Sequence, residues 1–363
     1  MTQDQDPQTQ RRRERASRPT VYRQWQAGEG IPSYTGSYVA DLYNLEVAPW
    51  ARTGQKGAFV NLASQELDDG QLSEIAPGGQ TEVQHHFYEA LIYVLEGRGA
   101  TTLWQSGGQK QTVEWQRGSL FSPPLNCYYQ HFNLDGSKRA LLYAATTAPA
   151  TMNLLRDPDF IFNASHVFAN RYDGQDDFFS NRGGPSESGH GWKTNFVPDL
   201  RAFELDAPRS DMHSGRGAGG SGMGFQMSDN AASVHISEFP PGTYKKAHRH
   251  GAGAHVIILG GEGYSMLHFE GKEHERIKAD WKDGSIFSPQ HWEYHQHFNT
   301  GPTPARYLAC TFGGAVIVSQ NAHVDSNQIE YEDQDPEVHE LYERECAKRG
   351  AEVVLPRPEY ARR

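Results

Sequence analysis

The chain has 363 residues, which at about 150 residues per domain predicts two domains. Its 45 acidic residues outnumber its 34 basic ones, and the formal net charge of −11 argues against nucleic acid or an anionic membrane as the main partner. No run approaches the roughly 18 apolar residues of a membrane-spanning helix, and three cysteines are too few for a disulfide framework, so we expect a protein of the reducing cytoplasm.

An internal repeat follows a polar, arginine-rich N-terminal stretch, and we interpret residues 1–44 as a tail or arm. Residues 164 positions apart match in the pairs Gly78 and Gly242, His86 and His250, Gly97 and Gly261, and Gly99 and Gly263. A later block, residues 117–133, recurs 166 positions on as residues 283–299. This regular offset predicts two homologous modules of roughly 100 residues each.

Both modules have the pattern of β structure. Short apolar segments such as residues 91–97 and 255–261 alternate with glycine-rich turns, which is typical of sandwiches and barrels. The intervening residues 163–229 are rich in Gly, Asp, Ser and Asn and are interpreted as loops, long enough to form a lid. Residues 335–350 predict a helix that begins at Asp335, ends at Gly350 and packs one face on a barrel or a second subunit.

A metal-ligand pattern occurs in the second module. His248 and His250 are two residues apart, so in a strand both imidazoles point to the same side. His295, in the strand after the turn at Pro289, is the best candidate for a third ligand. Imidazole suits Fe, Zn, Cu and Ni, so the residues alone leave the metal open.

These residues resemble the motifs of the cupin superfamily. Gly242, five further residues, His248 and His250 are similar to the first cupin motif, and Pro289, His295 and Asn299 are similar to the second. The chain therefore resembles a bicupin, which implies an all-β fold of two tandem cupin (jelly-roll) barrels with a C-terminal helix. The implied order is a tail or arm (1–44), an N-terminal cupin (45–165), a linker with loops (166–225), a metal-binding C-terminal cupin (226–320), and a helix with a tail (321–363).

The second module resembles the gentisate and salicylate 1,2-dioxygenase group more specifically. Ala254 stands where the usual cupin has a glutamate ligand, and that group binds iron through three histidines. The resemblance implies that His248, His250 and His295 hold Fe(II) and that His297 contacts the substrate. Val256 stands where the group has a carboxylate-binding arginine, so we expect a substrate without a carboxylate beside its chelating hydroxyl. The metal would also lie in the C-terminal barrel, whereas the group uses the N-terminal one.

The first module has Gln84, His86 and Tyr129 at the three ligand positions, so its metal site is interpreted as degraded. Beside the third ligand of the second module, Glu293 is a candidate base or ligand-orienting residue, or a solvent-exposed turn residue. His255 follows Ala254 and should face away from the pocket, to the surface or an interface.

Three functions are compatible with these observations. The first is a non-haem Fe(II) dioxygenase that acts with O2 on a small aromatic, enol or hydroxy substrate chelated to the metal. The second is a non-redox lyase or isomerase that uses Zn, Mn or Ni as a Lewis acid. The third is a non-enzymatic cupin that binds a small molecule. The bicupin resemblance also implies a homodimer or higher homo-oligomer.

Overall fold

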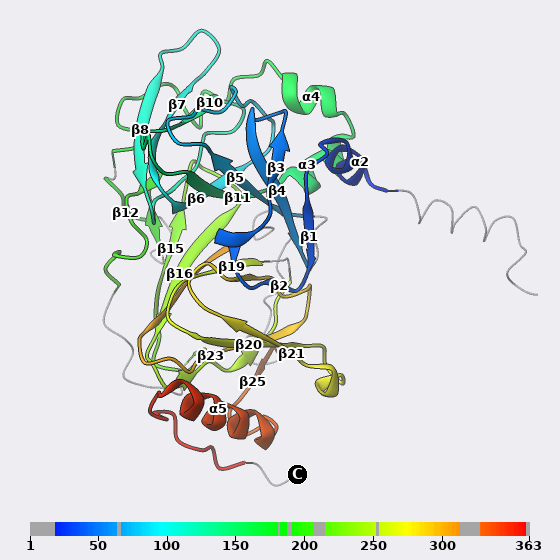
Figure 1. Ribbon diagram of the computed structural model, residues 1–363, viewed down its shortest axis with the longest axis vertical. Helices are drawn as coiled ribbons and strands as arrows, with labels where there is room; N and C mark the ends of the chain where they lie inside the picture. Colours follow the sequence, from blue (N-terminus) through cyan, green and yellow to red (C-terminus); the bar gives the residue numbers. More distant parts are fainter. Residues whose placement is uncertain are drawn as a thin grey trace, which may run out of the picture.

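The computed structural model describes residues 19–63, 67–180, 182–186, 191–205, 215–251, 254–312 and 327–360. Two jelly-roll barrels follow one another, the first at the top of Figure 1 and the second below it, with the C-terminal helix at the far end. The predicted all-β architecture is confirmed. Residues 1–18 of the stretch that we interpreted as a tail or arm (1–44) lie outside the described residues.

The first barrel consists of two sheets. The larger has the order β1-β4-β5-β11-β6-β9-β14, with β3 paired to β4; its strands are β1 (Ser33–Gly36), β3 (Ala48–Trp50), β4 (Gln55–Leu62), β5 (Asp69–Ile75), β6 (Ala90–Glu96), β9 (Leu120–Phe121), β11 (Ala140–Thr146) and β14 (Phe196–Val197). The smaller sheet has the order β10-β7-β8, with β7 (Arg98–Trp104), β8 (Gln111–Gln116) and β10 (Tyr128–Asn133). Helices α2 (Val21–Gly28), α3 (Ala148–Leu155) and α4 (Pro158–Asn163) and the short η2 (Leu42–Asn44) accompany this part of the chain.

The second barrel repeats the plan. Its larger sheet has the order β12-β13-β15-β16-β24-β19-β22-β2, with β2 (Tyr38–Val39), β12 (Gly184–Pro185), β13 (Trp192–Lys193), β15 (Ser221–Gln226), β16 (Ser233–Phe239), β19 (Ala254–Gly260), β22 (Ile286–Phe287) and β24 (Ala305–Thr311). The other sheet has the order β21-β20-β23-β18-β25, with β17 paired to β23; its strands are β17 (Thr243–Tyr244), β18 (Ala247–His248), β20 (Gly263–His268), β21 (Ile277–Trp281), β23 (Tyr294–Asn299) and β25 (Gln328–Ile329), and the short η3 (Glu273–Glu275) lies between β20 and β21.

Each barrel is completed by a dipeptide strand that precedes the other barrel's repeat. The N-terminal arm contributes β2, in which Val39 pairs with Ile286 of the second barrel. The segment expected as a linker contributes β14, in which Val197 pairs with Leu120 of the first barrel. Part of the arm and part of the expected linker therefore form strands that tie the barrels together.

Alternation along the strands divides the apolar side chains between the barrel interiors and the contact between barrels. In β19, Val256 and Ile258 belong to the interior cluster of the second barrel, whereas Ile257 and Leu259 belong to a cluster shared with first-barrel residues such as Leu141. His255 points to the same side of the strand as Ile257 and Leu259, because its Nδ1 lies 2.5 Å from the Tyr143 hydroxyl of the first barrel. The expectation that His255 faces an interface holds within one chain.

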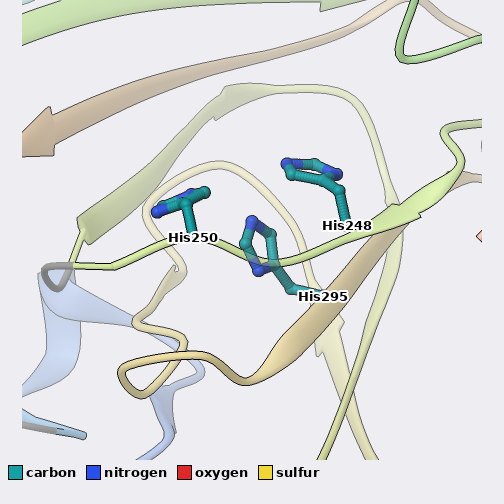
Figure 2. Close-up of side chains that lie close together, drawn as sticks. All are labelled: His248, His250 and His295. Carbon is teal, nitrogen blue, oxygen red and sulfur yellow. The ribbon is translucent and has the colours of Figure 1, made fainter. Parts of the chain in front are cut away.

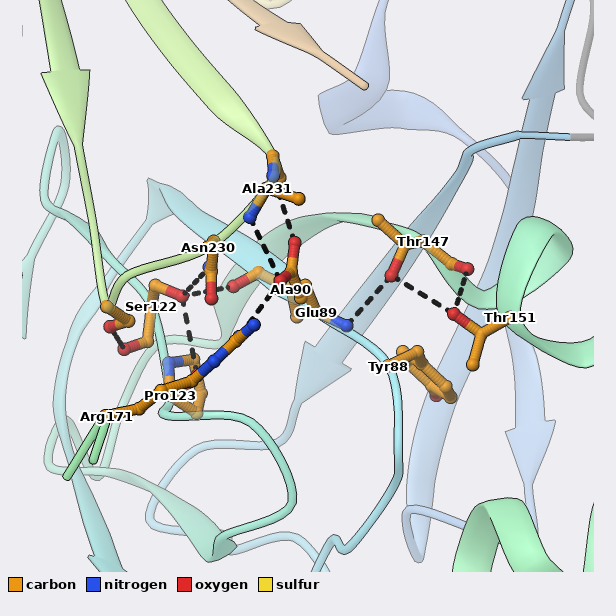
Figure 3. Close-up of polar contacts among 12 residues, drawn as sticks. Tyr88, Glu89, Ala90, Ser122, Pro123, Thr147, Thr151, Arg171, Asn230 and Ala231 are labelled. Atoms are coloured by element: carbon orange, nitrogen blue, oxygen red, sulfur yellow. Dashed lines mark hydrogen bonds and ion pairs between the residues drawn. The ribbon is translucent and has the colours of Figure 1, made fainter. Parts of the chain in front are cut away.

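A polar contact also joins the barrels (Figure 3). The Glu89 carboxylate, before β6, accepts hydrogen bonds from the backbone N–H groups of Ala231 (3.0 Å) and Ala232 (2.9 Å), just before β16. Arg171 donates to the same carboxylate from the connecting segment at 3.0 Å. Nearby, Asn230 donates to the Ser122 hydroxyl at 2.8 Å. Three stretches of chain are thus fixed by one buried anion.

Helix α5 (Pro336–Arg349) confirms the prediction at the C-terminus. Asp335 caps it by accepting from the Glu337 N–H, and Gly350 ends it at φ 74°. Its buried face packs on the second barrel in a cluster of Val338, Tyr342, Cys346, Tyr244, Tyr264 and Phe298. Among the described residues, no helix is long and apolar enough to cross a membrane.

Candidate metal centre

The structure brings the three predicted histidines together in the second barrel (Figure 2). His248 ends β18 and pairs across the sheet with His295 of β23, while His250 lies just beyond β18. One nitrogen of each ring lies within 4.8 Å of the others. Within the described ranges, this is the single cluster of three or more His, Cys, Asp or Glu side chains that can hold a metal ion.

Hydrogen bonds to the main chain select one nitrogen of each ring as the ligand. The Nδ1 atoms lie 3.1 Å from the carbonyl oxygen of Lys246 for His248, 3.1 Å from that of Glu293 for His295, and 3.3 Å from that of Gly251 for His250. A carbonyl only accepts, so these contacts place the ring proton on Nδ1 and leave Nε2 with the lone pair. Such outer contacts orient histidines that bind metals.

The electrostatics also suit a cation. Burial lowers the pKa of His248 and His295 well below the ordinary value, and the neighbouring ring charges lower it further. Both imidazoles are therefore neutral near pH 7, as a metal ligand must be. The Ala254 side chain carries no donor atom, so these donors leave coordination positions for other ligands. The residues present fit a divalent transition metal.

His297 lies beside the triad on β23. Its ring centre is 5.6 Å from that of His295 and 6.2 Å from that of His248. Its Nδ1 lies 2.9 Å from the Ser265 hydroxyl, which also accepts from the Trp281 indole at 3.1 Å.

The same three-residue chain occurs in the first barrel. There, His131 Nδ1 lies 2.7 Å from the Thr101 hydroxyl, to which Trp115 donates at 2.9 Å. Because the first barrel has no triad among its described residues, this network belongs to the fold. In the second barrel the candidate metal site lies next to it.

Glu293 is a buried turn residue, 2 % exposed, and not the solvent-exposed one that we considered. Its carboxylate accepts from the backbone N–H of Gln290 at 2.8 Å, and burial raises its pKa. Its contact with the triad is made through the main-chain carbonyl that bonds to His295. The geometry therefore connects Glu293 to the orientation of a ligand.

The first barrel has other side chains at the positions equivalent to the three histidines. Gln84 pairs with Tyr129, as His248 pairs with His295, and its amide donates to the carbonyl oxygen of Glu82 at 3.0 Å. His86 Nε2, the atom equivalent to a ligand nitrogen, bonds to the Tyr129 hydroxyl at 2.8 Å. A hydrogen bond between side chains therefore occupies the place where the second barrel assembles nitrogen ligands.

Sequence reasoning missed Lys245 and the residues around it. The Lys245 ammonium donates to the Ser237 hydroxyl at 2.6 Å and to the Tyr307 hydroxyl at 2.9 Å. Lys245 also lines a cavity of about 310 Å³ together with Arg216, the glycine-rich residues 217–224, His235 and Ser237. The pair of lysines just before Ala247 and His248 was the available signal, but alternation along a strand assigns the inward position to Lys246.

Comparison with known proteins gives no family assignment. No family model matches the sequence, and no curated protein matches it. Solved structures that align with the chain include Bacillus subtilis oxalate decarboxylase with its Mn(II) centres, at a TM-score of 0.48 and 13 % identity over 76 % of each chain. Salicylate 1,2-dioxygenase from Pseudaminobacter salicylatoxidans aligns at a TM-score of 0.49 and 13 % identity over 68 % of this chain and 71 % of that one. At these values the likeness does not indicate a reaction, which has to be inferred from the chain's own residues.

Proposed function

We propose that this protein is a metal-dependent bicupin enzyme, a non-haem Fe(II) dioxygenase of a small aromatic, enol or hydroxy compound. The observation that carries the proposal is the triad, in which each Nδ1 is bonded to a main-chain carbonyl, so that the lone pair of each ring lies on Nε2, and in which the ligand nitrogens lie within 4.8 Å of one another. His248, His250 and His295 would hold the ion.

The ligand set defines what the site offers. Three neutral imidazoles leave a divalent ion with its full charge, which favours binding of paired substrate oxygens. A ferrous ion held there would supply redox chemistry with O2. The same ligands also suit Zn, Mn or Ni, so a non-redox lyase or isomerase that uses the metal as a Lewis acid is the second candidate.

The chain's own residues have separate roles. We assign His297 to contact with the substrate, because its Nδ1 is bonded to Ser265 and no described residue bonds to its Nε2. That nitrogen can donate to, or accept a proton from, a substrate oxygen. We assign Glu293 to positioning, because it holds the turn whose carbonyl orients His295.

Metal content tests this proposal with a matched control. Untagged wild-type protein is compared with His250→Ala and with His86→Ala, the change at the equivalent position of the first barrel. We expect about one metal ion per chain, lost in His250→Ala and kept in His86→Ala. Oxygen uptake with catechols, hydroxy acids and diketones then separates the dioxygenase from the non-redox enzyme. An absence of bound metal, or equal loss in both variants, would overturn the assignment in favour of a binding protein.

A cytoplasmic location and a homodimer stay predictions from the sequence. Light scattering coupled to size-exclusion chromatography measures the mass against the 40.6 kDa of one chain. A monomer at micromolar concentration would contradict the expected oligomer.

A further inference from the structure

Two cationic side chains in the second barrel have no carboxylate partner among the described residues. They are Lys245 and Arg216, and both line the cavity of about 310 Å³. The chain as a whole carries a net charge of −11, so acidic residues are not scarce. A buried cation without a counterion is costly, and such groups often bind an anion.

Lys245 is 6 % exposed and its ammonium group points into the barrel. Two of its three N–H groups donate, to Ser237 and Tyr307, and both acceptors are neutral hydroxyls. The third N–H is left for another acceptor. The Lys245 nitrogen also lies 4.8 Å from the ring centre of Tyr307 and 5.2 Å from that of Phe239. These contacts fix the direction of the ammonium group before any ligand binds.

Arg216 precedes the glycine-rich entry to β15. Its guanidinium donates to the neutral side-chain oxygen of Gln328 at 3.2 Å, which leaves further N–H groups for a ligand. The arginine 164 positions earlier, Arg52, is paired with Glu29 through two hydrogen bonds, at 2.5 and 3.0 Å. Arg216 stands 164 positions after Arg52, but it has no acidic partner within the part of the chain that the structure describes.

Two acidic residues on or just after nearby strands of the second barrel are paired elsewhere. Glu238, next to Ser237 on β16, binds Arg306 at 2.7 Å. Glu330, just after β25, binds Lys246 at 2.5 Å. Neither ion pair involves Lys245 or Arg216, so the anion that suits the cavity has to come from outside these pairs.

The cavity is close to the metal centre. The Tyr307 ring, bonded to Lys245, lies 5.4 Å from the His297 ring, and His297 in turn lies beside the triad. A molecule at the metal can therefore extend to the cationic pair.

We propose that Lys245 and Arg216 form a carboxylate subsite, and that the substrate is an anion whose carboxylate binds there while its oxygen atoms face the triad. The subsite rests on the proposed function for its orientation toward the metal. It replaces the sequence-based expectation of a substrate without a carboxylate, since the cation missing at Val256 is supplied from two other positions. Glycines 217, 219, 220, 222 and 224 leave the cavity wall low in side chains.

Ligand affinity without turnover tests the subsite. Zinc-loaded protein is titrated calorimetrically with 2-hydroxybenzoate and with 2-hydroxybenzamide, which lacks the negative charge. We expect wild-type protein to prefer the carboxylate, and Lys245→Met and Arg216→Met each to reduce that preference by about tenfold to a hundredfold, the range for a lost charge-assisted hydrogen bond. Lys246→Met is the matched control, because Lys246 is a neighbouring lysine already paired with Glu330, and it should keep the full preference.

The metal itself also attracts a carboxylate, so a preference in wild-type protein alone does not identify the subsite. The comparison between variants separates the contribution of the metal from that of the two cations. Unchanged affinity for the amide shows that a variant still has an intact cavity, and Arg216→Met provides the result if Lys245→Met fails to fold. A full carboxylate preference in Lys245→Met and Arg216→Met, with zinc bound, overturns the subsite and leaves the metal centre standing. If wild-type protein does not hold zinc, the proposed function is overturned instead. The preference for the carboxylate over the amide is then compared between wild-type protein and the variants without metal.

Discussion

Replacing Glu89 by glutamine should weaken the connection between the two barrels. One carboxylate oxygen accepts from Arg171 and Ala231, and the other accepts from the Ala232 N–H at 2.9 Å. A glutamine amide can keep its oxygen toward the first two donors, but its NH2 group then faces the Ala232 N–H. One buried donor is orphaned, which costs about 1–3 kcal/mol, and the bond from Arg171 loses its ionic partner. We expect Glu89→Gln to lower the free energy of unfolding by about 2–4 kcal/mol.

Urea unfolding followed by tryptophan fluorescence measures this change. With an m value of about 3 kcal/mol per M, the transition midpoint should fall by roughly 1 M. Glu340→Gln is the matched control, because Glu340 also binds an arginine, Arg357 at 2.9 Å, but both side chains are about half exposed, at 47 % and 50 %. Exposed pairs contribute about 0–1 kcal/mol. Equal midpoints for the two variants would refute the view that the Glu89 contact holds the barrels together.

Three further predictions concern the repeat. Gln84→His combined with Tyr129→His should raise the metal content from one to two ions per chain, because the Gln84 amide already bonds to the carbonyl that would orient a new imidazole. Burial lowers the pKa of His131 to about 3 in the folded protein. Between about pH 6.5 and pH 3 the imidazole is therefore protonated in the unfolded state and neutral in the folded state, so the free energy of unfolding decreases as the pH is lowered. His131→Gln should reduce the loss measured between pH 7 and pH 4 by about 3 kcal/mol. Gly263→Ala should cost roughly 1–3 kcal/mol, because a Cβ there would lie 1.9 Å from the Phe298 carbonyl oxygen, whereas Gly260→Ala meets open space.

Each of these predictions has a contrary result. An unchanged metal content in the double variant would mean that the ligand positions of the first barrel are not equivalent to those of the second. Equal pH dependence of the urea midpoint in wild-type protein and His131→Gln would mean that His131 is not held neutral by burial. Equal stability of Gly263→Ala and Gly260→Ala would contradict the close approach of the strands at Gly263.

The repeat and the triad could be predicted from the sequence because they depend on short-range rules. Two histidines two residues apart in a strand point to one side, whatever the rest of the fold does. His295 was found because it follows the turn at Pro289 at the spacing of the second cupin motif, which the chain resembles. Helix α5 was found because its cap, Asp335, and its end, Gly350, are local signals.

The surroundings of the triad were decided by tertiary structure. Alternation along a regular strand assigns the inward position to Lys246, but the chain is interrupted between β17 and β18, where Lys245 N–H bonds to the His297 carbonyl and Lys246 N–H to the Arg216 carbonyl. The interruption turns Lys245 into the barrel. Arg216 comes from a glycine-rich stretch that has no periodic pattern, and only the packing of that stretch against residues 245–246 brings it to the cavity.

The sequence by itself therefore determined which histidines form the candidate metal site, since ligand spacing and the frame of the motif are encoded locally. The tertiary structure decided which charges surround that candidate site and which contacts stand at the equivalent positions of the first barrel. Those features depend on irregular backbone and on contacts between segments far apart in the chain, such as the bond between His86 and Tyr129, and no pattern in either segment specifies them.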